Sequence, residues 1–333
     1  MKRIRFAIDR RFTWKRMIVP GVTAVTFWAL AVVLYGVSGG QIFALVNFGY
    51  LGTALGIGLG LYALLPRRQK PLGRRVSLLL IGLYLFFFIG VISQENIQVE
   101  GVWWSLINGT FYAAVWHYFV AKIVGPLLFG RLWCGWACWS VMVFDLLPYK
   151  QPSGRLPGKW GWLRYGHIVL SAVVVVVLWR VFGVQVGTNS ATAVVWFLIG
   201  NIFYYVVGIG LAVGLKDNRA FCKYLCPVAV PLKLTSRFSL LKIGTDDSQC
   251  NDCHACVKMC PMDIQIPDYV HAGQRVLSTE CTLCQTCVTV CAHDALKLSY
   301  GFDMGGRELL RLRTNGETAV YQPNISGGTQ HAQ

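Results

Sequence analysis

Eight of the twelve cysteines fall in two runs toward the C-terminal end of the chain, and both runs have the spacing C-x2-C-x2-C-x3-C. The first run is Cys250, Cys253, Cys256 and Cys260, followed by Pro261, and the second is Cys281, Cys284, Cys287 and Cys291, followed by Ala292. Three thiolates on one tight loop can reach three irons of a cubane, which leaves the fourth iron for a distant cysteine. The spacing therefore predicts two 4Fe-4S clusters and one-electron chemistry.

In two-cluster ferredoxins the fourth cysteine of each run binds the cluster of the other run. Applied to this sequence, the rule predicts one cluster on Cys250, Cys253, Cys256 and Cys291, and a second on Cys281, Cys284, Cys287 and Cys260. The alanine after the second run changes the local turn and leaves the ligand set unchanged.

Zinc is the alternative metal for these cysteines, because thiolate quartets also bind zinc tetrahedrally. Zinc ribbons usually divide their ligands into two separated C-x-x-C pairs, whereas this chain has two uninterrupted quartets, which favours iron and sulfide. His254 and His293 lie within or beside the runs. Since eight cysteines already fill eight ligand positions, we interpret both histidines as loop residues that could tune a potential without binding iron.

A second set of four cysteines follows two hydrophobic stretches. These exit cysteines are Cys134 and Cys138, and Cys222 and Cys226, and each pair lies in a motif that reads R-x-(F/W)-C-x3-C and begins at Arg131 or Arg219. Each motif follows a pair of apolar segments, so the two halves look like an internal repeat that would bring both pairs to one place. The four thiols could hold a third cluster, bind another metal, form a redox-active dithiol set, or be ordinary buried thiols.

The elements that position these cysteines are predicted to lie in a membrane. Of the 333 residues, 55% are hydrophobic and only 14% are charged, where a soluble domain has about 25% charged residues. Because a membrane-spanning helix needs about 20 mainly apolar residues, we expect six spans. They cover residues 17–37, 42–65, 76–92, 102–129, 165–182 and 193–215.

Lysine and arginine alternate between the connections of these spans, and short cytoplasmic loops are enriched in both residues. The basic connections are the N-terminal segment and the loops after the second and fourth spans; the other three connections have no lysine or arginine. This pattern places both termini and every cysteine on the cytoplasmic side, where clustered cysteines bind metals rather than form disulfides. The net charge of +16 thus lies beside apolar spans, and we expect no nucleic acid partner.

Taken together, the exit motifs and the two quartets resemble the NapH-type membrane ferredoxins associated with periplasmic nitrate reductases, and the cytoplasmic part of NosR-type proteins. An accessory protein of cytochrome oxidase assembly is less similar. The resemblance covers residues 130–298 and the hairpins before them. It implies that the eight C-terminal cysteines bind clusters, that the exit cysteines are those of the family, and that electrons pass from membrane quinol toward a respiratory reductase or its accessory proteins.

The sequence departs from the family pattern at two points. Trp139 stands where the family usually has proline, and we expect no flavin-binding extracytoplasmic domain of the NosR kind before the spans.

Two histidines raise the question of a haem. His117 lies twelve residues before the end of the fourth span at Phe129, about 18 Å deep, whereas His167 is two residues into the fifth span, so one haem between them is not expected. An ionisable group inside a span is a functional candidate, and for His117 we consider a quinone contact or a hydrogen-bonded core histidine. Lys122, in the inner half of the fourth span, is expected to extend its amine toward the nearer membrane surface.

The expected architecture is an all-α membrane domain of six transmembrane helices joined to a small α+β two-cluster module. The divisions are a basic segment at 1–16, the membrane domain at 17–240, the ferredoxin module at 241–300 and a partly disordered tail at 301–333. The expected function is electron relay in a bacterial inner membrane between quinone and other redox proteins or reductase subunits. A maturation factor that reduces a client metalloenzyme and a membrane redox sensor are the alternatives.

Overall fold

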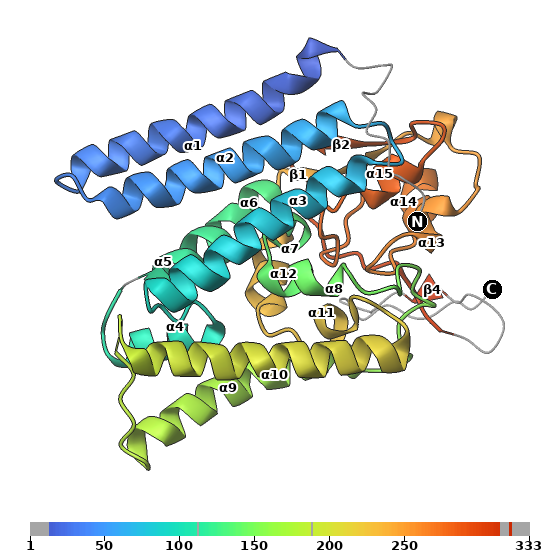
Figure 1. Cartoon of the computed structure of the whole chain (residues 1–333). Coiled ribbons are helices and arrows are strands. Elements are labelled where there is room, and N and C mark those ends of the chain that lie inside the picture. Colours follow the sequence, from blue (N-terminus) through green and yellow to red (C-terminus); the bar gives the residue numbers. More distant parts are fainter. Residues whose placement is uncertain (1–12, 112, 188, 314–319, 322–333) are drawn as a thin grey trace.

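A computed structural model describes residues 13–111, 113–187, 189–313 and 320–321. Most of the expected basic segment, 1–16, and more than half of the expected tail, 301–333, therefore lie outside the described residues. Five helices are long and apolar enough to cross a membrane: Trp14–Val37, Ile42–Leu64, Lys70–Ile92, Trp160–Arg180 and Ala191–Leu215. Figure 1 shows these helices on one side of the molecule and the cysteine-rich C-terminal segment at one end of them.

The membrane part begins with an antiparallel hairpin of α1 (Ile18–Val37) and α2 (Ile42–Leu64), which packs on α3 (Lys70–Leu83) and its π-helical continuation η2 (Tyr84–Ile92). On the other side lie α9 (Leu163–Arg180) and α10 (Ala191–Leu215) (Figure 1). Large apolar side chains cover their outward faces; Val169, Leu170 and Ile202, for example, are exposed. Exposed apolar faces of this extent are expected where lipid, not water, is the solvent.

The expected fourth span, 102–129, is not one helix. It divides into α4 (Val99–Ile107) and a second helical stretch formed by α5 (Ala113–Tyr118), η3 (Phe119–Val124) and α6 (Gly125–Phe129). The chain turns between them at Asn108 and Gly109, where the glycine has φ +64° and the asparagine side chain donates to the carbonyl of Val186 at 2.8 Å. A count of apolar residues does not detect this turn. The second stretch is apolar but shorter than the other spans.

Short helices follow each half of the membrane part. After α6 come α7 (Leu132–Trp136) and α8 (Trp139–Phe144), and after α10 come α11 (Ala220–Tyr224) and α12 (Ala229–Ser236). The one-turn helix η4 (Trp160–Trp162) precedes α9. Each exit motif thus occupies a short helix and the turn that follows it, which is the equivalence that the repeated sequence motif predicts.

The C-terminal segment is α+β. Strand β1 (Leu241–Thr245) pairs antiparallel with β2 (Leu296–Tyr300), with Ile243 opposite Leu298. Between them lie η5 (Asp247–Gln249), α13 (Ala255–Lys258), α14 (Ile266–His271) and α15 (Thr286–Val290); β3 (Leu310–Arg311) and β4 (Val320–Tyr321) follow. Its core joins Tyr269 and Leu309 to several of the cysteines. Residues 301–313, which the sequence assigned to the tail, therefore pack as part of this unit.

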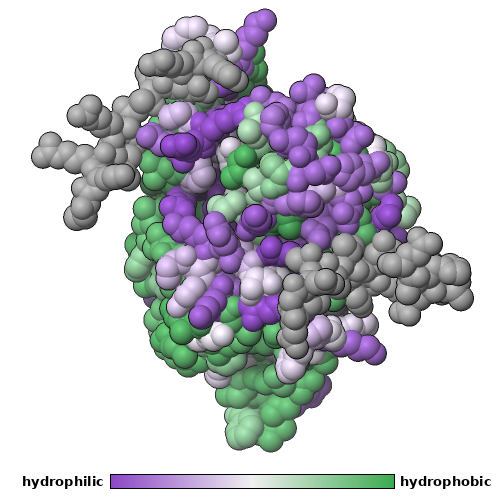
Figure 2. Space-filling model, turned by 90° about the vertical axis from the view of Figure 1, so that its right-hand side faces the viewer, coloured by the Kyte–Doolittle hydropathy of each residue, from purple (hydrophilic) through white to green (hydrophobic). Residues whose placement is uncertain are grey.

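The end of the molecule that carries this segment differs in polarity from the helices behind it. In Figure 2, which views that end, hydrophilic residues cover most of the face, and apolar residues form the rim where the helices emerge. The boundary between the two is where a membrane surface is expected to lie, and the exit motifs are at this level (Figure 1).

Candidate iron-sulfur centres and their contacts

The two C-terminal cysteine runs fold into loops of the same shape. Positive φ angles occur at equivalent positions, at Asp252 and His254 around Cys253 (53° and 52°), and at Leu283 and Gln285 around the second cysteine of the other run (48° and 58°). In each run a short helix, α13 or α15, begins at once and carries the third cysteine. Non-glycine residues in this conformation cost of order 1 kcal/mol or more each, and such strain gathers at functional sites.

Four cysteines line one cavity inside the C-terminal segment. They are Cys260, Cys281, Cys284 and Cys287, and the rest of the lining is mainly apolar, with Ile243, Met262, Ile264 and Val276 among it. This is the grouping that exchange of the fourth ligand predicts for the second cluster. The backbone N–H of Ile264 also donates to Sγ of Cys260 at 3.5 Å, and amide bonds to sulfur are one of the means by which a protein sets a cluster potential.

The other cysteines of the first run differ in their burial. Cys253 is exposed, whereas Cys256 is partly buried against the core. Burial, together with the nearby thiols of Cys253, Cys260 and Cys291, raises the pKa of Cys256 to about 12, so a free thiol there holds its proton at neutral pH. A metal that binds thiolates displaces that proton. The donor set and the apolar, partly enclosed surroundings fit a thiolate-bound cluster, and the ligand assignments themselves remain predictions.

The exit cysteines come together, as the internal repeat predicts. Cys222 is buried and packs in one cluster with Cys138 and Cys226. Burial raises the pKa of Cys226 to about 12, with Cys134 and Cys138 as the next contributions. Burial also raises the pKa of Cys222, and the thiols of Cys226, Cys138 and Cys134 add to that effect while Arg219 opposes it. All twelve cysteines of the chain are free of disulfides.

The first exit motif packs directly on the second cysteine run. A Cβ atom added to Gly135 would lie 2.3 Å from the carbonyl oxygen of Thr282 and 3.3 Å from the backbone nitrogen of Cys284. Beside this contact, the indole Nε1 of Trp136 donates to the carbonyl of Leu283 at 3.1 Å. The position therefore requires glycine, and the backbone that carries Cys134 meets the backbone that carries Cys284 without an intervening side chain.

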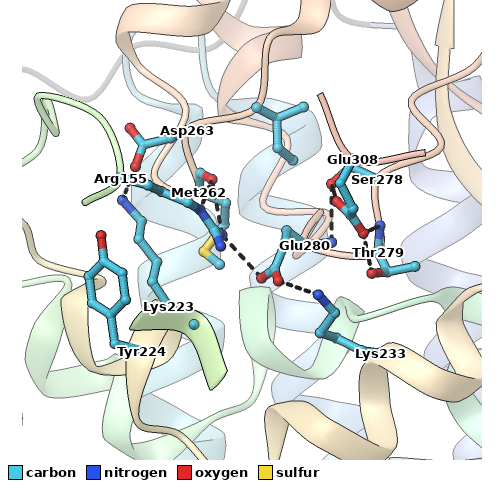
Figure 3. A network of polar contacts seen from close by, with 12 residues as sticks. Arg155, Lys223, Tyr224, Lys233, Met262, Asp263, Ser278, Thr279, Glu280 and Glu308 are labelled. Atoms are coloured by element: carbon cyan, nitrogen blue, oxygen red, sulfur yellow. Dashed lines mark hydrogen bonds and ion pairs between the residues drawn. The ribbon is translucent and has the colours of Figure 1, made fainter. Parts of the chain in front are cut away.

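One buried carboxylate of the C-terminal segment pairs with several cations of the membrane part. Glu280, which precedes the first cysteine of the second run, is 1% exposed and pairs with four cations, of which Figure 3 labels Arg155 and Lys233. They are Arg131 (3.0 Å), Arg155 (3.1 Å), Arg164 (3.1 Å) and Lys233 (2.5 Å). Burial by itself would raise the pKa of Glu280, but the four cations hold it well below its usual range. We call this group the Glu280 cage.

The arginine of the second exit motif has a buried partner of its own. Arg219 pairs with Asp145 at 2.9 Å and donates to the carbonyl of Cys134 at 3.2 Å, and Arg74 pairs with the same carboxylate at 2.7 Å. Burial would raise the pKa of Asp145, but Arg219 and Arg74 lower it to about 2. Close by, Lys223 bridges Asp217 and Asp263. The motif arginines were visible in the sequence, and their acidic partners were not.

Two histidines were considered as ligands of a haem, and each of them lies against different residues. His167 Nδ1 lies 2.7 Å from the carbonyl of Leu225, next to the second exit motif. The His117 ring is 4.9 Å from that of Trp133, and its Nε2 is buried without a hydrogen-bond partner among the described residues. Elsewhere in the membrane part, the Tyr204 hydroxyl donates to Glu100 at 3.2 Å.

Comparison with known proteins identifies both cysteine regions. A family model described as a 4Fe-4S dicluster domain matches residues 249–296, and one described as a 4Fe-4S binding domain matches 118–161 and 192–245, so each of the latter segments contains one exit motif. No solved structure matches.

Three relatives are each similar over about half of the chain. An uncharacterized protein of Methanocaldococcus jannaschii is 30% identical over 200 residues, 55% of this chain and 78% of its own length. The ferredoxin-type protein NapH of Haemophilus influenzae is 28% identical over 196 residues, 54% of this chain and 66% of that protein. The putative electron transport protein YccM of Escherichia coli is 28% identical over 211 residues, 56% of this chain and 57% of its own length.

Proposed function

This chain belongs to the NapH/NosR-type family of 4Fe-4S ferredoxins, and we propose that it relays electrons between the quinone pool and a respiratory reductase or its accessory proteins. The coarser function, iron-sulfur electron transfer by a multi-pass membrane protein, follows from the family and from the five apolar helices. The direct backbone contact between Gly135 and Thr282 carries the proposal, because it joins the membrane exit to the C-terminal cysteines.

The proposed ligands follow the exchanged pattern. One cluster takes Cys250, Cys253, Cys256 and Cys291, and the other takes Cys281, Cys284, Cys287 and Cys260, a set supported by the cavity that these last four line. When bound, such clusters supply one-electron transfer at potentials between about −700 and +450 mV. The residues of the chain hold the sulfurs, exclude water with Met262 and Ile264, and fix the loops through the Glu280 cage.

We also propose that the exit cysteines Cys134, Cys138, Cys222 and Cys226 hold a third 4Fe-4S cluster. Their convergence supports this, as does the match of a 4Fe-4S binding model to each exit segment. A cluster there would lie between the membrane part and the second run. For the quinone, the buried Nε2 of His117, which has no hydrogen-bond partner in the described part of the chain, supports a contact with a quinone oxygen.

The remaining assignments are part of the same proposal. We place the chain in a bacterial inner membrane with six membrane crossings, the stretch Ala114–Phe129 being the short one, and with both termini and all clusters on the cytoplasmic side. The divisions are those expected from the sequence, with residues 301–313 joined to the two-cluster module because Leu309 and Leu310 belong to its core.

Iron analysis and quinol reduction test the proposal. Anaerobically purified protein should contain about twelve irons per chain with matching acid-labile sulfide, where the C-terminal clusters alone give about eight. In membranes, a quinol analogue should reduce the clusters within seconds. Zinc in place of iron would overturn the cluster assignment. Iron-loaded protein that quinol does not reduce would instead favour a maturation factor or a redox sensor.

A further inference from the structure

Lys122 is buried beside the exit cysteines rather than extended to the membrane surface. It lies in η3, is 1% exposed, and its Nζ has no hydrogen-bond partner among the described residues. Its amine is 3.5 Å from the centroid of the Trp133 ring, and Trp133 immediately precedes Cys134. The sequence-based expectation that this lysine reaches the nearer surface is therefore wrong, because the Trp133 ring lies against its amine and α12 packs on η3.

A lysine ammonium in such a place needs a negative partner. Burial of an unpaired charge is costly, and the face of an aromatic ring offsets only part of that cost. The ionisable groups close enough to act on Lys122 include the imidazole of His117 and the thiols of Cys138, Cys134 and Cys226. As free thiols they are neutral, so in the protein without metal they do not compensate the charge.

The two arginines of the exit motifs are already engaged. Arg131 is paired with Glu280, and Arg219 with Asp145. Lys122 is thus the cation near the exit cysteines whose charge lacks a carboxylate partner within the described part of the chain.

We infer that Lys122 is the counter-charge of an anionic cluster bound by the four exit cysteines, and that it raises the reduction potential of that cluster. The inference rests on the third cluster of the proposed function. A cubane held by four thiolates is negatively charged, and it becomes more negative by one charge when it accepts an electron from a quinol or from dithionite. A fixed positive charge stabilises the reduced form more than the oxidised form, which makes the cluster a better electron acceptor.

An anaerobic redox titration of the full-length protein, purified without quinone, tests this role. Lys122→Met removes the charge at similar side-chain size, Lys122→Arg retains it, and Lys150→Met removes an exposed lysine as the control. The exit-cluster signal in electron paramagnetic resonance is the one absent from the Cys134→Ser/Cys222→Ser double variant. We expect Lys122→Met to keep about twelve irons and to lower the midpoint potential of that signal alone, with the other two proteins close to wild type.

The possible results separate this inference from the proposed function. Wild-type protein with only about eight irons would overturn the third cluster and the role of Lys122 together. Twelve irons in Lys122→Met with an unchanged potential would overturn the counter-charge alone, and slower reduction by a quinol analogue in that case would assign Lys122 to the quinone. Loss of the exit irons in Lys122→Met but not in Lys122→Arg would support the inference; their loss in both would refute it, since shape rather than charge would then matter.

Discussion

Exchange of Glu280 for glutamine would remove the carboxylate that pairs with three buried arginines and with the partly exposed Lys233. The four come from separate segments: Arg131 precedes α7, Arg155 lies in the loop after α8, Arg164 is in α9 and Lys233 is in α12. Loss of one partner from a buried ion pair costs about 3–5 kcal/mol, because the charge that remains is not compensated. Glutamine would add to this cost, because its side-chain N–H groups would face the N–H donors of the surrounding cations.

This free energy corresponds to a factor of about 10² to nearly 10⁴ in the equilibrium between folded and unfolded protein. At about 2 °C per kcal/mol, the melting temperature should fall by roughly 6–10 °C. The measurement is a thermal melt of anaerobically purified, detergent-solubilised protein, with iron content followed on the same samples to detect release of the C-terminal clusters.

Asp294→Asn is the matched control. Asp294 pairs with Arg67 across the same two parts of the chain, but the two side chains are 65% and 36% exposed, and surface ion pairs contribute about 0–1 kcal/mol. The control should melt close to wild type. If Glu280→Gln also melts within about 2 °C of wild type, the Glu280 cage does not hold the C-terminal segment in place, and the reasoning from buried charge fails.

Three further predictions concern other positions. Cys134→Ser with Cys222→Ser should lower the iron content from about twelve to about eight per chain; an unchanged total would rule out a third cluster. Gly135→Ala should lower thermal stability and cluster retention, because its Cβ would lie 2.3 Å from a carbonyl oxygen, whereas Gly166→Ala, with open space around it, should not; equal melts would contradict the close contact. Burial raises the pKa of Glu95 to about 7 from 4.5. Between these values the folded protein holds a proton that the unfolded chain releases, so stability should fall as pH rises from about 5 to about 7, and Glu95→Gln should flatten that slope.

The cysteine spacing and the apolar windows predicted much of what the structure contains. Spacing alone grouped Cys260 with the second run, and these four cysteines do line one cavity. The apolar windows predicted six spans; within the described residues five helices are long and apolar enough to cross a membrane, and the window 102–129 is divided. Both features are local, because the cysteine spacing and the apolar windows can each be recognised within one short stretch of the sequence.

Contacts between residues that are distant in the sequence could not be predicted from such local patterns. Nothing near Glu280 in the sequence indicates that Arg131 and Arg164 will surround it, and nothing near Gly135 indicates that Thr282 will approach it. The turn at Asn108 was missed for a different reason, because a hydropathy window averages over the few polar residues that interrupt it. Lys122 was assigned to the surface because a helix considered alone does not reveal that Trp133 and α12 will pack against it.

The two exit motifs repeat in sequence, but their arginines have different partners. This difference explains how the exit cysteines and the two C-terminal cysteine runs come to lie together. Arg219, in the second motif, pairs with Asp145 at the end of the first half and so closes the membrane part on itself. Arg131, in the first motif, pairs with Glu280 and so joins the first half to the second cysteine run. Each arginine is 1% exposed, so each pair has little access to water and neither half can separate without leaving a buried charge. A relay built in this way needs no domain movement, because the same charges that fold the exit loops also fix the distance to the next group of cysteines.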